Sequence, residues 1–210
     1  MSKSRLLVTN IVGIIVILLL VGFGGYYFYE KANYVKTDEA QVEAPLSQVI
    51  ASANGQLSEW NAKEGDSVSQ GDSVGSLKEG DKSTDVTSMI DGTIIKNNAS
   101  QNQLVKAGDV LAQTADLSKI YINANIKETD LGDLEEGDSV DITVDGDSGK
   151  VFKGHVEAIG RATNSVSSML PAQNTGNYTK VTQKVPVKIS IDDASDKVLP
   201  GMNAEVKISI

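Results

Sequence analysis

The pattern of apolar and polar residues divides the chain into an N-terminal apolar run and a long region of short alternating segments. Residues 6–28 read LLVTNIVGIIVILLLVGFGGYYF and contain no charged side chain. As a helix this run is about 35 Å long, enough to cross a hydrocarbon core of about 30 Å. It is longer than the apolar part of a signal peptide, and no small-x-small cleavage site follows it. We therefore predict a tail at residues 1–5, a transmembrane helix at residues 6–28 and location in the cell membrane.

The charges on the two sides of this run do not predict its orientation in the membrane. Lys3 and Arg5 precede the run, and Lys31 and Lys36 follow it, so the two flanks carry equal positive charge. Tyr26, Tyr27 and Tyr29 lie at its C-terminal end, where amphipathic rings favour the membrane interface.

Beyond Ala40 the apolar residues recur mostly at every second position, which is typical of half-buried strands. The clearest runs are residues 120–126, 140–144, 181–191 and 202–210. We predict a mainly β fold class, with one helical turn at 129–136 capped by Thr129. Pro186 lies within the third run and indicates an edge strand or a bulge.

A repeat is visible within this β region. The stretch from Gly55 through Gly71-Asp72 aligns with the stretch from Gly92 through Gly108-Asp109, and the glycines have the same spacing in both copies. We interpret each copy as a strand-turn-strand unit with its glycines and aspartates at turns. Two such units can pack face to face, each covering the apolar side of the other.

The repeat resembles the biotinyl/lipoyl fold, a flattened barrel built from two similar halves. Carrier domains of that fold hold a modified lysine on the turn between the halves. Lys82 is the candidate here, within the connection KEGDKSTDVTS at residues 78–88. An exposed lysine in a polar turn is the competing interpretation, and an anchored chain with a second β domain favours it.

Composition excludes several classes of function. After Tyr29 the chain carries 17 basic and 28 acidic residues, a net charge of −11 that repels nucleic acid. Cysteine is absent, which removes disulfides, thiolate catalysis and cysteine-based zinc sites. We predict no cofactor and no metal site.

Two serine motifs imitate hydrolase signatures. Gly71-Asp-Ser-Val-Gly75 fits G-x-S-x-G, but a nucleophile elbow requires a helix directly after the serine, and none is predicted there. Gly146-Asp-Ser-Gly149 resembles the serine motif of chymotrypsin-type proteases, whose histidine precedes the serine. The single histidine, His155, follows it and lies in a predicted strand. We predict that the chain is not an enzyme.

Several ordered motifs together resemble membrane fusion proteins of the HlyD/EmrA type, the adaptors of efflux and secretion pumps. They are Tyr34–Val42 after the apolar run, the two half-motifs, Ile126–Leu131 with Glu136–Val140, a cluster formed by Pro171, Gly176, Asn177, Tyr178, Lys180, Gln183 and Pro186, and a closing motif that contains Pro200 and Gly201. The cluster is specific to the EmrA branch.

The resemblance implies a linker and first barrel strand at 29–46, a lipoyl-like domain at 47–117 with halves 50–77 and 89–117, and a β-barrel domain at 118–210. It also implies a cytoplasmic N-terminus, extracytoplasmic β domains, self-association into a ring and a partner exporter, which we expect to be of the major-facilitator type. Family members usually insert a long helical hairpin between the lipoyl halves, whereas residues 78–88 are too few for one. A short form without this bridge fits a single-membrane bacterium.

Most residues of this cluster lie in a polar segment at residues 160–180, which is too rich in Ser, Asn and Gly to form core. Its default interpretation is a long surface loop, but loops of this length are uncommon in compact domains unless they bind something or are disordered. We predict that Asn177, Tyr178 and Lys180 contact the partner transporter.

Overall fold

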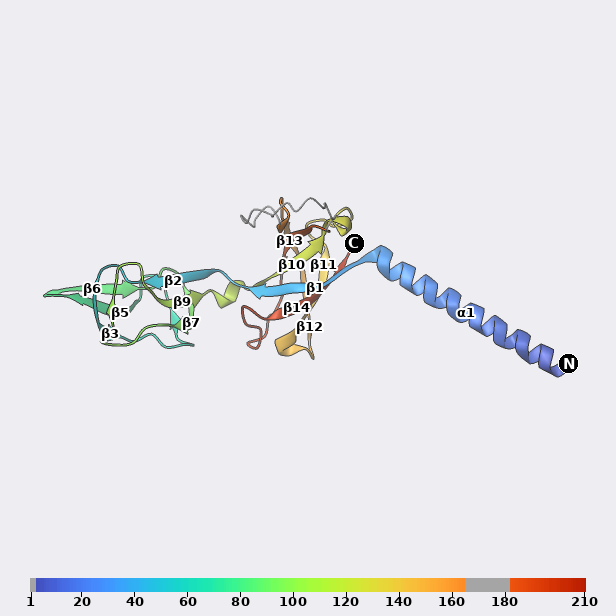
Figure 1. Ribbon diagram of the computed structural model, residues 1–210, viewed down its shortest axis with the longest axis horizontal. Coiled ribbons are helices and arrows are strands. Elements are labelled where there is room, and N and C mark those ends of the chain that lie inside the picture. The colour runs from blue at the N-terminus through green and yellow to red at the C-terminus, as the bar shows by residue number, and fades with distance from the viewer. Residues whose placement is uncertain (1–2, 165–181) are drawn as a thin grey trace, which may run out of the picture.

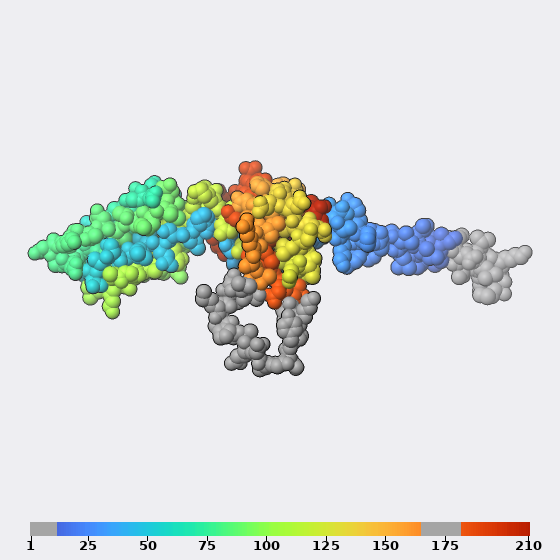
Figure 2. Space-filling model, turned by 90° about the horizontal axis from the view of Figure 1, so that it is seen from above, coloured from blue at the N-terminus to red at the C-terminus, as the bar shows by residue number. Residues whose placement is uncertain are grey.

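The computed structural model describes residues 3–164 and 182–210, and it has three parts in line. A long helix lies at one end, a β-barrel in the middle and a two-sheet sandwich at the other end (Figure 1). The same order is visible after a quarter turn (Figure 2). The molecule is therefore elongated, with the sandwich held away from the helix by the barrel.

The helix α1 spans Lys3–Asn33 and passes directly into the first barrel strand, β1 (Tyr34–Glu43). Its 31 residues are about 46 Å long, more than a hydrocarbon core needs. Residues Val12–Asn33 are apolar enough to cross a membrane, and none of their most apolar window is buried within the protein. This exposed apolar surface is consistent with a membrane anchor.

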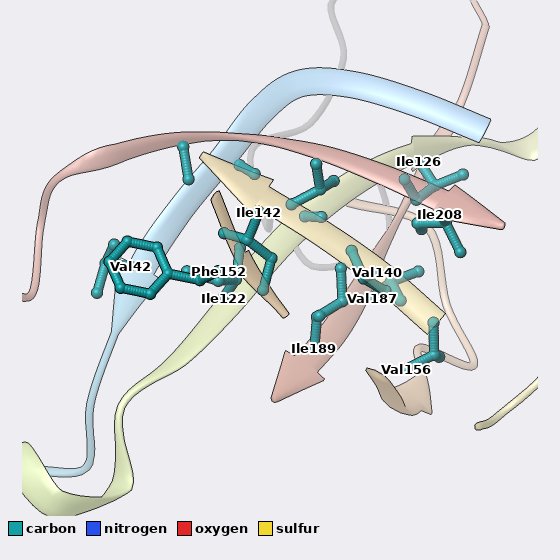
Figure 3. Packing of buried hydrophobic residues seen from close by; sticks show 14 of the residues in the cluster. Val42, Ile122, Ile126, Val140, Ile142, Phe152, Val156, Val187, Ile189 and Ile208 are labelled. Carbon is teal, nitrogen blue, oxygen red and sulfur yellow. The ribbon is translucent and has the colours of Figure 1, made fainter. Parts of the chain in front are cut away.

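Six strands close into the barrel in the order β1-β10-β13-β12-β11-β14. Besides β1 they are β10 (Tyr121–Lys127), β11 (Ser139–Val144), β12 (Val151–Ile159), β13 (Lys184–Ser190) and β14 (Asn203–Ser209). Every second residue points inward, which is why the alternating runs of the sequence become a core. Figure 3 shows Val42, Ile122, Ile142, Phe152 and Ile189 converging inside it.

The sandwich is formed by two four-stranded sheets, ordered β2-β9-β7-β4 and β6-β5-β3-β8. The first contains β2 (Leu46–Ile50), β9 (Val110–Ala115), β7 (Gly92–Asn97) and β4 (Ser67–Val68). The second contains β6 (Lys82–Thr87), β5 (Ser73–Glu79), β3 (Gly55–Trp60) and β8 (Leu104–Val105). A separate core that includes Leu57, Leu77, Ile94 and Leu111 lies between the sheets.

The repeat is larger than the sequence indicated. The unit β2-β3-β4-β5 recurs as β6-β7-β8-β9, and the two units exchange strands: β2 pairs with β9, β6 with β5, β4 with β7 and β8 with β3. The segment at residues 78–88, expected to be a plain connection, is a β-hairpin in which Glu79 pairs with Lys82. Neither unit therefore completes a sheet without the other.

Two local predictions were wrong in part. Strand β13 lies between β10 and β12 and is not an edge, although it contains Pro186; the β12–β13 pair does have a register shift, but between Val156 and Ala158 and not at the proline. Pro186 lies just past the end of β12 at Ile159, where the missing N–H interrupts no strand pairing, and its carbonyl accepts the amide of Gly160 at 2.8 Å. The helical turn expected at 129–136 is a 3-10 turn at Glu128–Asp130, and Lys127, not Thr129, is at its N-cap.

Candidate docking site on the barrel

Two of the motifs that carried the family resemblance meet at one place on the barrel, beside the residue that directly precedes a third motif, Ile126–Leu131. Strand β1 contributes Thr37 and Glu39, β10 contributes Asn125, and β13 begins with Lys184. Lys184 forms an ion pair with Glu39, and the Thr37 hydroxyl donates to the carbonyl of Asn125 at 3.2 Å. The Asn164 side-chain amide donates to Oδ1 of Asn125 at 2.7 Å. Segments far apart in sequence thus form one surface.

A β-bulge shapes this surface. The register between β1 and β14 shifts between Thr37 and Ala40, so Asp38 and Glu39 lie opposite the single residue Glu205 and β1 carries one extra residue; both side chains are exposed. The amide of Glu39 donates to the Thr37 hydroxyl at 3.1 Å. The Thr37 hydroxyl therefore links the bulge residue Glu39 to the neighbouring strand β10.

The surface beside the bulge is hollowed, and we call this hollow the bulge cleft. It consists of two adjoining depressions of about 240 and 130 Å³ that share Asp38, Glu39 and Asn125. Its other lining residues are Val35, Lys36, Thr37, Ala40, Gln41, Glu43, Asn123, Ile126, Lys127, Asp130, Lys184 and Asn203. The lining is mostly charged and amide side chains, which suits hydrogen bonding to a polar partner surface.

Glu43 is held in the cleft by two donors. The hydroxyl of Tyr121 donates to Oε2 at 2.9 Å, and the amide of Asn123 donates to Oε1 at 2.8 Å. Burial raises the pKa of Tyr121, and the hydrogen bond to Glu43 adds to this rise, so the phenol stays a neutral donor at physiological pH. Two hydrogen bonds thus hold the Glu43 carboxylate in the wall of the cleft.

The serine motifs do not assemble a catalytic group. Ser73 begins strand β5, so a strand and not a helix follows the G-x-S-x-G pattern. His155 lies in β12 as predicted, and its Nδ1 is 2.8 Å from the hydroxyl of Ser190, not from Ser148. Among the described residues, no three acidic or histidine side chains are grouped so as to hold a metal ion.

The Gly-Asp pairs form a repeated turn. In Gly71-Asp72 the amide of Ser69 donates to the Asp72 carboxylate at 2.8 Å, and the Asp72 amide donates back to the Ser69 carbonyl at 3.0 Å. Gly108-Asp109 repeats this arrangement with Lys106. Both glycines have φ near +90°, which glycine adopts without strain. Gly65-Asp66 and Gly137-Asp138 form the same turn, so the Gly-Asp turn is not confined to the two half-motifs.

The other two glycines of the half-motifs are not turn residues. Gly55 begins β3 and Gly92 begins β7. A Cβ on Gly55 would lie 2.7 Å from the Lys78 carbonyl oxygen, and one on Gly92 would lie 2.3 Å from that of Ala115. These glycines are explained by close approach of the neighbouring strand.

Lys82 is exposed beside the turn of the β5–β6 hairpin, at the end of the sandwich that lies farthest from the helix (Figure 1). This location fits the interpretation of Lys82 as an exposed lysine in a polar turn. The position is also reachable by a modifying enzyme.

Pro200 and Gly201 lie between the two β domains. The amide of Gly201 donates to the Val42 carbonyl at 2.8 Å, and the Gln41 side chain donates to the Gly201 carbonyl at 3.0 Å. Pro200 lines an apolar groove of about 420 Å³ with Leu199 and Leu117 on one side and Ile94 and Ile95 on the other. These motif residues therefore border the domain junction and not the bulge cleft.

The remaining residues of the predicted partner contact, Pro171, Gly176, Asn177, Tyr178 and Lys180, lie outside the described residues. Gln183 is described: its carbonyl accepts the amide of Glu128 at 2.9 Å, which places it at the bulge-cleft end of the barrel, next to Lys184.

Comparison with known proteins agrees with this geometry. Residues 45–116 match the family described as the YhbJ barrel-sandwich hybrid domain, and residues 119–209 match the AAEA-like β-barrel domain. The chain is 55% identical over 210 residues to YhbJ of Bacillus subtilis (strain 168), whose curated name places it among efflux system components. The alignment covers 100% of this chain and 95% of YhbJ.

More distant relatives match a part of their own length. EmrK of Escherichia coli (strain K12), a multidrug resistance protein by name, is 40% identical over 53% of this chain and 29% of its own. Among solved structures, a MacA-MexA chimera aligns with a TM-score of 0.68 at 18% identity, covering 85% of this chain and 82% of the chimera. The periplasmic adaptor protein EmrA aligns with a TM-score of 0.56 at 14% identity, covering 84% and 98%.

A β-barrel joined to a two-unit sandwich, with an apolar helix in front, is the architecture of an efflux adaptor. The chain belongs to the HlyD/EmrA-type membrane fusion (periplasmic adaptor) protein family. Within it, the chain is a short, YhbJ-like efflux component with a β-hairpin at the outer end of its sandwich.

Proposed function

We propose that this protein is a non-enzymatic adaptor that docks onto a major-facilitator-type exporter in the same membrane. In this proposal α1 anchors the chain with its N-terminus in the cytoplasm, and the two β domains lie outside. Energy for transport comes from the exporter, and the adaptor contributes position: it binds one state of the exporter more tightly and so favours that state.

The bulge cleft is the observation that carries this proposal. The family motifs of β1 and β13 contact each other there through the Glu39–Lys184 ion pair, and Asn125 of β10 accepts hydrogen bonds from Thr37 and Asn164. The predicted contact residues Asn177, Tyr178 and Lys180 belong to the segment that connects Asn164 to Lys184, so both ends of that segment adjoin the cleft. Polar, charged surfaces of this kind give specificity and orientation to a protein–protein contact.

A crosslinking experiment tests the docking. A photoreactive amino acid replaces Asp38 in the tagged full-length chain, which is then irradiated in host membranes and analysed by mass spectrometry. We expect a crosslinked exporter of the major-facilitator type. The matched control places the same amino acid at Glu79, an exposed acidic residue of the β5–β6 hairpin. Equal crosslinking from both positions, or none from Asp38, would contradict the proposal.

The carrier-domain alternative is tested separately. Intact mass of the native chain reports a lipoyl or biotinyl adduct on Lys82 directly. We expect the unmodified mass, and an adduct would favour the alternative.

A further inference from the structure

The junction between α1 and the barrel carries a cluster of opposite charges on a chain that is otherwise acidic. Glu30 lies in the last turn of the helix, and its Oε1 atom forms ion pairs with two lysines. Nζ of Lys36 is 2.6 Å away and Nζ of Lys207 is 3.3 Å away. Lys207 also lies 3.8 Å from the centre of the Tyr34 ring. We call Glu30, Lys31, Lys36 and Lys207 the junction cluster.

Three cations and one carboxylate give the junction cluster itself a net charge of +2, and Glu205, whose carboxylate also acts on Lys36, lowers the local surplus to +1. The hydrogen bond to Glu30 raises the pKa of Lys36, so this ammonium stays charged at any physiological pH. The rest of the extracytoplasmic part is strongly acidic, so the positive charge here is local. This local surplus of positive charge attracts an anion that can reach both the helix and strand β1.

The depth of the cluster decides which anion it meets. The apolar run ends at Phe28, and Glu30 follows two residues later, about 3 Å further along the helix axis. Lys36 and Lys207 extend back to Glu30, which brings their ammonium groups to the same level. If α1 crosses the membrane, that level is the layer of lipid phosphates.

The cluster also has a concave, partly aromatic surface. A depression of about 180 Å³ is lined by Tyr27, Glu30, Lys31, Tyr34 and Lys36. The aromatic rings suit the interface between acyl chains and headgroups, and the ammonium groups suit phosphate oxygens.

We propose that the junction cluster is a binding site for an anionic phospholipid, whose phosphodiester lies against Lys31 and Lys36 in the depression between α1 and β1. Zwitterionic lipids bind less well, because their ammonium group is repelled by the same surplus of charge. The proposal rests on the membrane anchor of the proposed function and goes beyond it, since the lipid would fix how the barrel stands over the membrane.

Native mass spectrometry of the full-length chain tests the site. Detergent-solubilised protein is offered equal amounts of phosphatidylglycerol and phosphatidylcholine, and bound lipids are counted. Each ammonium near a lipid phosphate contributes about five-fold in affinity, so we expect a clear excess of phosphatidylglycerol adducts. Replacing Lys31, Lys36 and Lys207 by Gln should reduce that excess several-fold.

The matched control replaces Lys78, Lys96 and Lys106, three exposed lysines of the sandwich, by Gln. It removes the same charge and should keep the excess of the wild-type chain. Glu30→Gln supplies a change in the opposite direction: it removes the internal counter-charge and should raise the excess of phosphatidylglycerol. Unfolding of the triple variant cannot produce such a rise.

Two results would overturn the lipid site: an unchanged excess in the triple variant, or no rise with Glu30→Gln. Alkaline extraction of host membranes distinguishes failure of the lipid site from failure of the membrane anchor. A wild-type chain that leaves the membrane on extraction would contradict the anchor itself, whereas one that stays without a lipid preference would contradict the lipid site alone.

Discussion

Lys184 contacts both carboxylate oxygens of Glu39 across 145 positions of sequence, and this ion pair joins the start of β13 to the bulge of β1. Both side chains are partly exposed, so the pair adds little to stability, about 0.5 kcal/mol or less. Its importance is that it fixes the outline of the bulge cleft.

The charge-swapped variants Glu39→Lys and Lys184→Glu should each weaken crosslinking from Asp38 to the exporter, with little change in thermal unfolding. The double swap restores the ion pair. If the pair serves only to shape the cleft, the double variant should recover crosslinking; if the side chains themselves contact the exporter, it should not. Full crosslinking in both single variants would contradict a role for the cleft.

Gly154→Ala should destabilise the barrel by about 1–3 kcal/mol or more, because an added Cβ would force the backbone apart. That Cβ would lie 1.9 Å from the Ser190 carbonyl oxygen on the neighbouring strand β13. Thermal unfolding followed by circular dichroism measures the loss. Gly149→Ala is the matched control, because a Cβ there meets nothing within 4 Å. Equal stability of the two variants would contradict the close packing of β12 on β13.

Thr114→Val should stabilise the sandwich by about 1 kcal/mol. The Thr114 side chain is fully buried in β9, and its hydroxyl has no hydrogen-bond partner among residues 3–164 and 182–210. Valine has nearly the same shape and removes the unpaired hydroxyl. Denaturant unfolding checks the gain, and Thr143→Val, at a half-buried position of β11, provides the comparison. A loss of stability in Thr114→Val would indicate that the hydroxyl is bonded after all.

Asp116 should make the domain junction sensitive to acid. The hydrogen bond from Lys119, followed by that from Ser118, lowers the pKa of Asp116 below its usual value. A lowered pKa in the folded state means that the stabilisation is fully present above the unfolded pKa of about 3.9 and is lost as the pH falls through the folded pKa.

Asp116→Ala should therefore lower stability by about 1 kcal/mol at neutral pH, since it removes both the side-chain cap of the short 3-10 turn at Leu117–Lys119 and the ion pair. The difference from the wild-type chain should shrink as the pH falls below about 3.9. Unfolding curves across this pH range measure it, and a constant difference would contradict the assignment.

Alternation of apolar residues was sufficient to predict β10, β11, β13 and β14, because a strand with one buried face has only one register that hides that face. The first strand, β1, was expected from the family resemblance instead. Reasoning from the sequence pattern misjudged Pro186, since sequence does not reveal where the neighbouring strand ends. It also divided the repeat too narrowly. Strand β2 (LSQVI) contains three apolar residues and β6 (KSTDVT) only one, so their equivalence is visible only from their matching partners β9 and β5.

The candidate site was predictable in its parts and not in its assembly. Family motifs indicated Gln183, Pro186 and the stretch from Tyr34 to Val42, but nothing in their spacing indicated that Glu39 meets Lys184. Pairing between residues so far apart depends on barrel closure, which a single sequence does not encode locally. The junction cluster was missed for the same reason, because Lys207 reaches Glu30 only after β14 has paired with β1.

The hydrogen bond from the Asp116 amide to the Pro45 carbonyl, 3.0 Å long, shows that the chain leaves the barrel and returns to it at neighbouring points. The whole sandwich is thus a single excursion inserted between β1 and β10. An insertion whose two ends are adjacent can be exchanged, lengthened or removed while the barrel still closes. The sandwich of such a protein can therefore change in sequence and size while the barrel keeps its fold.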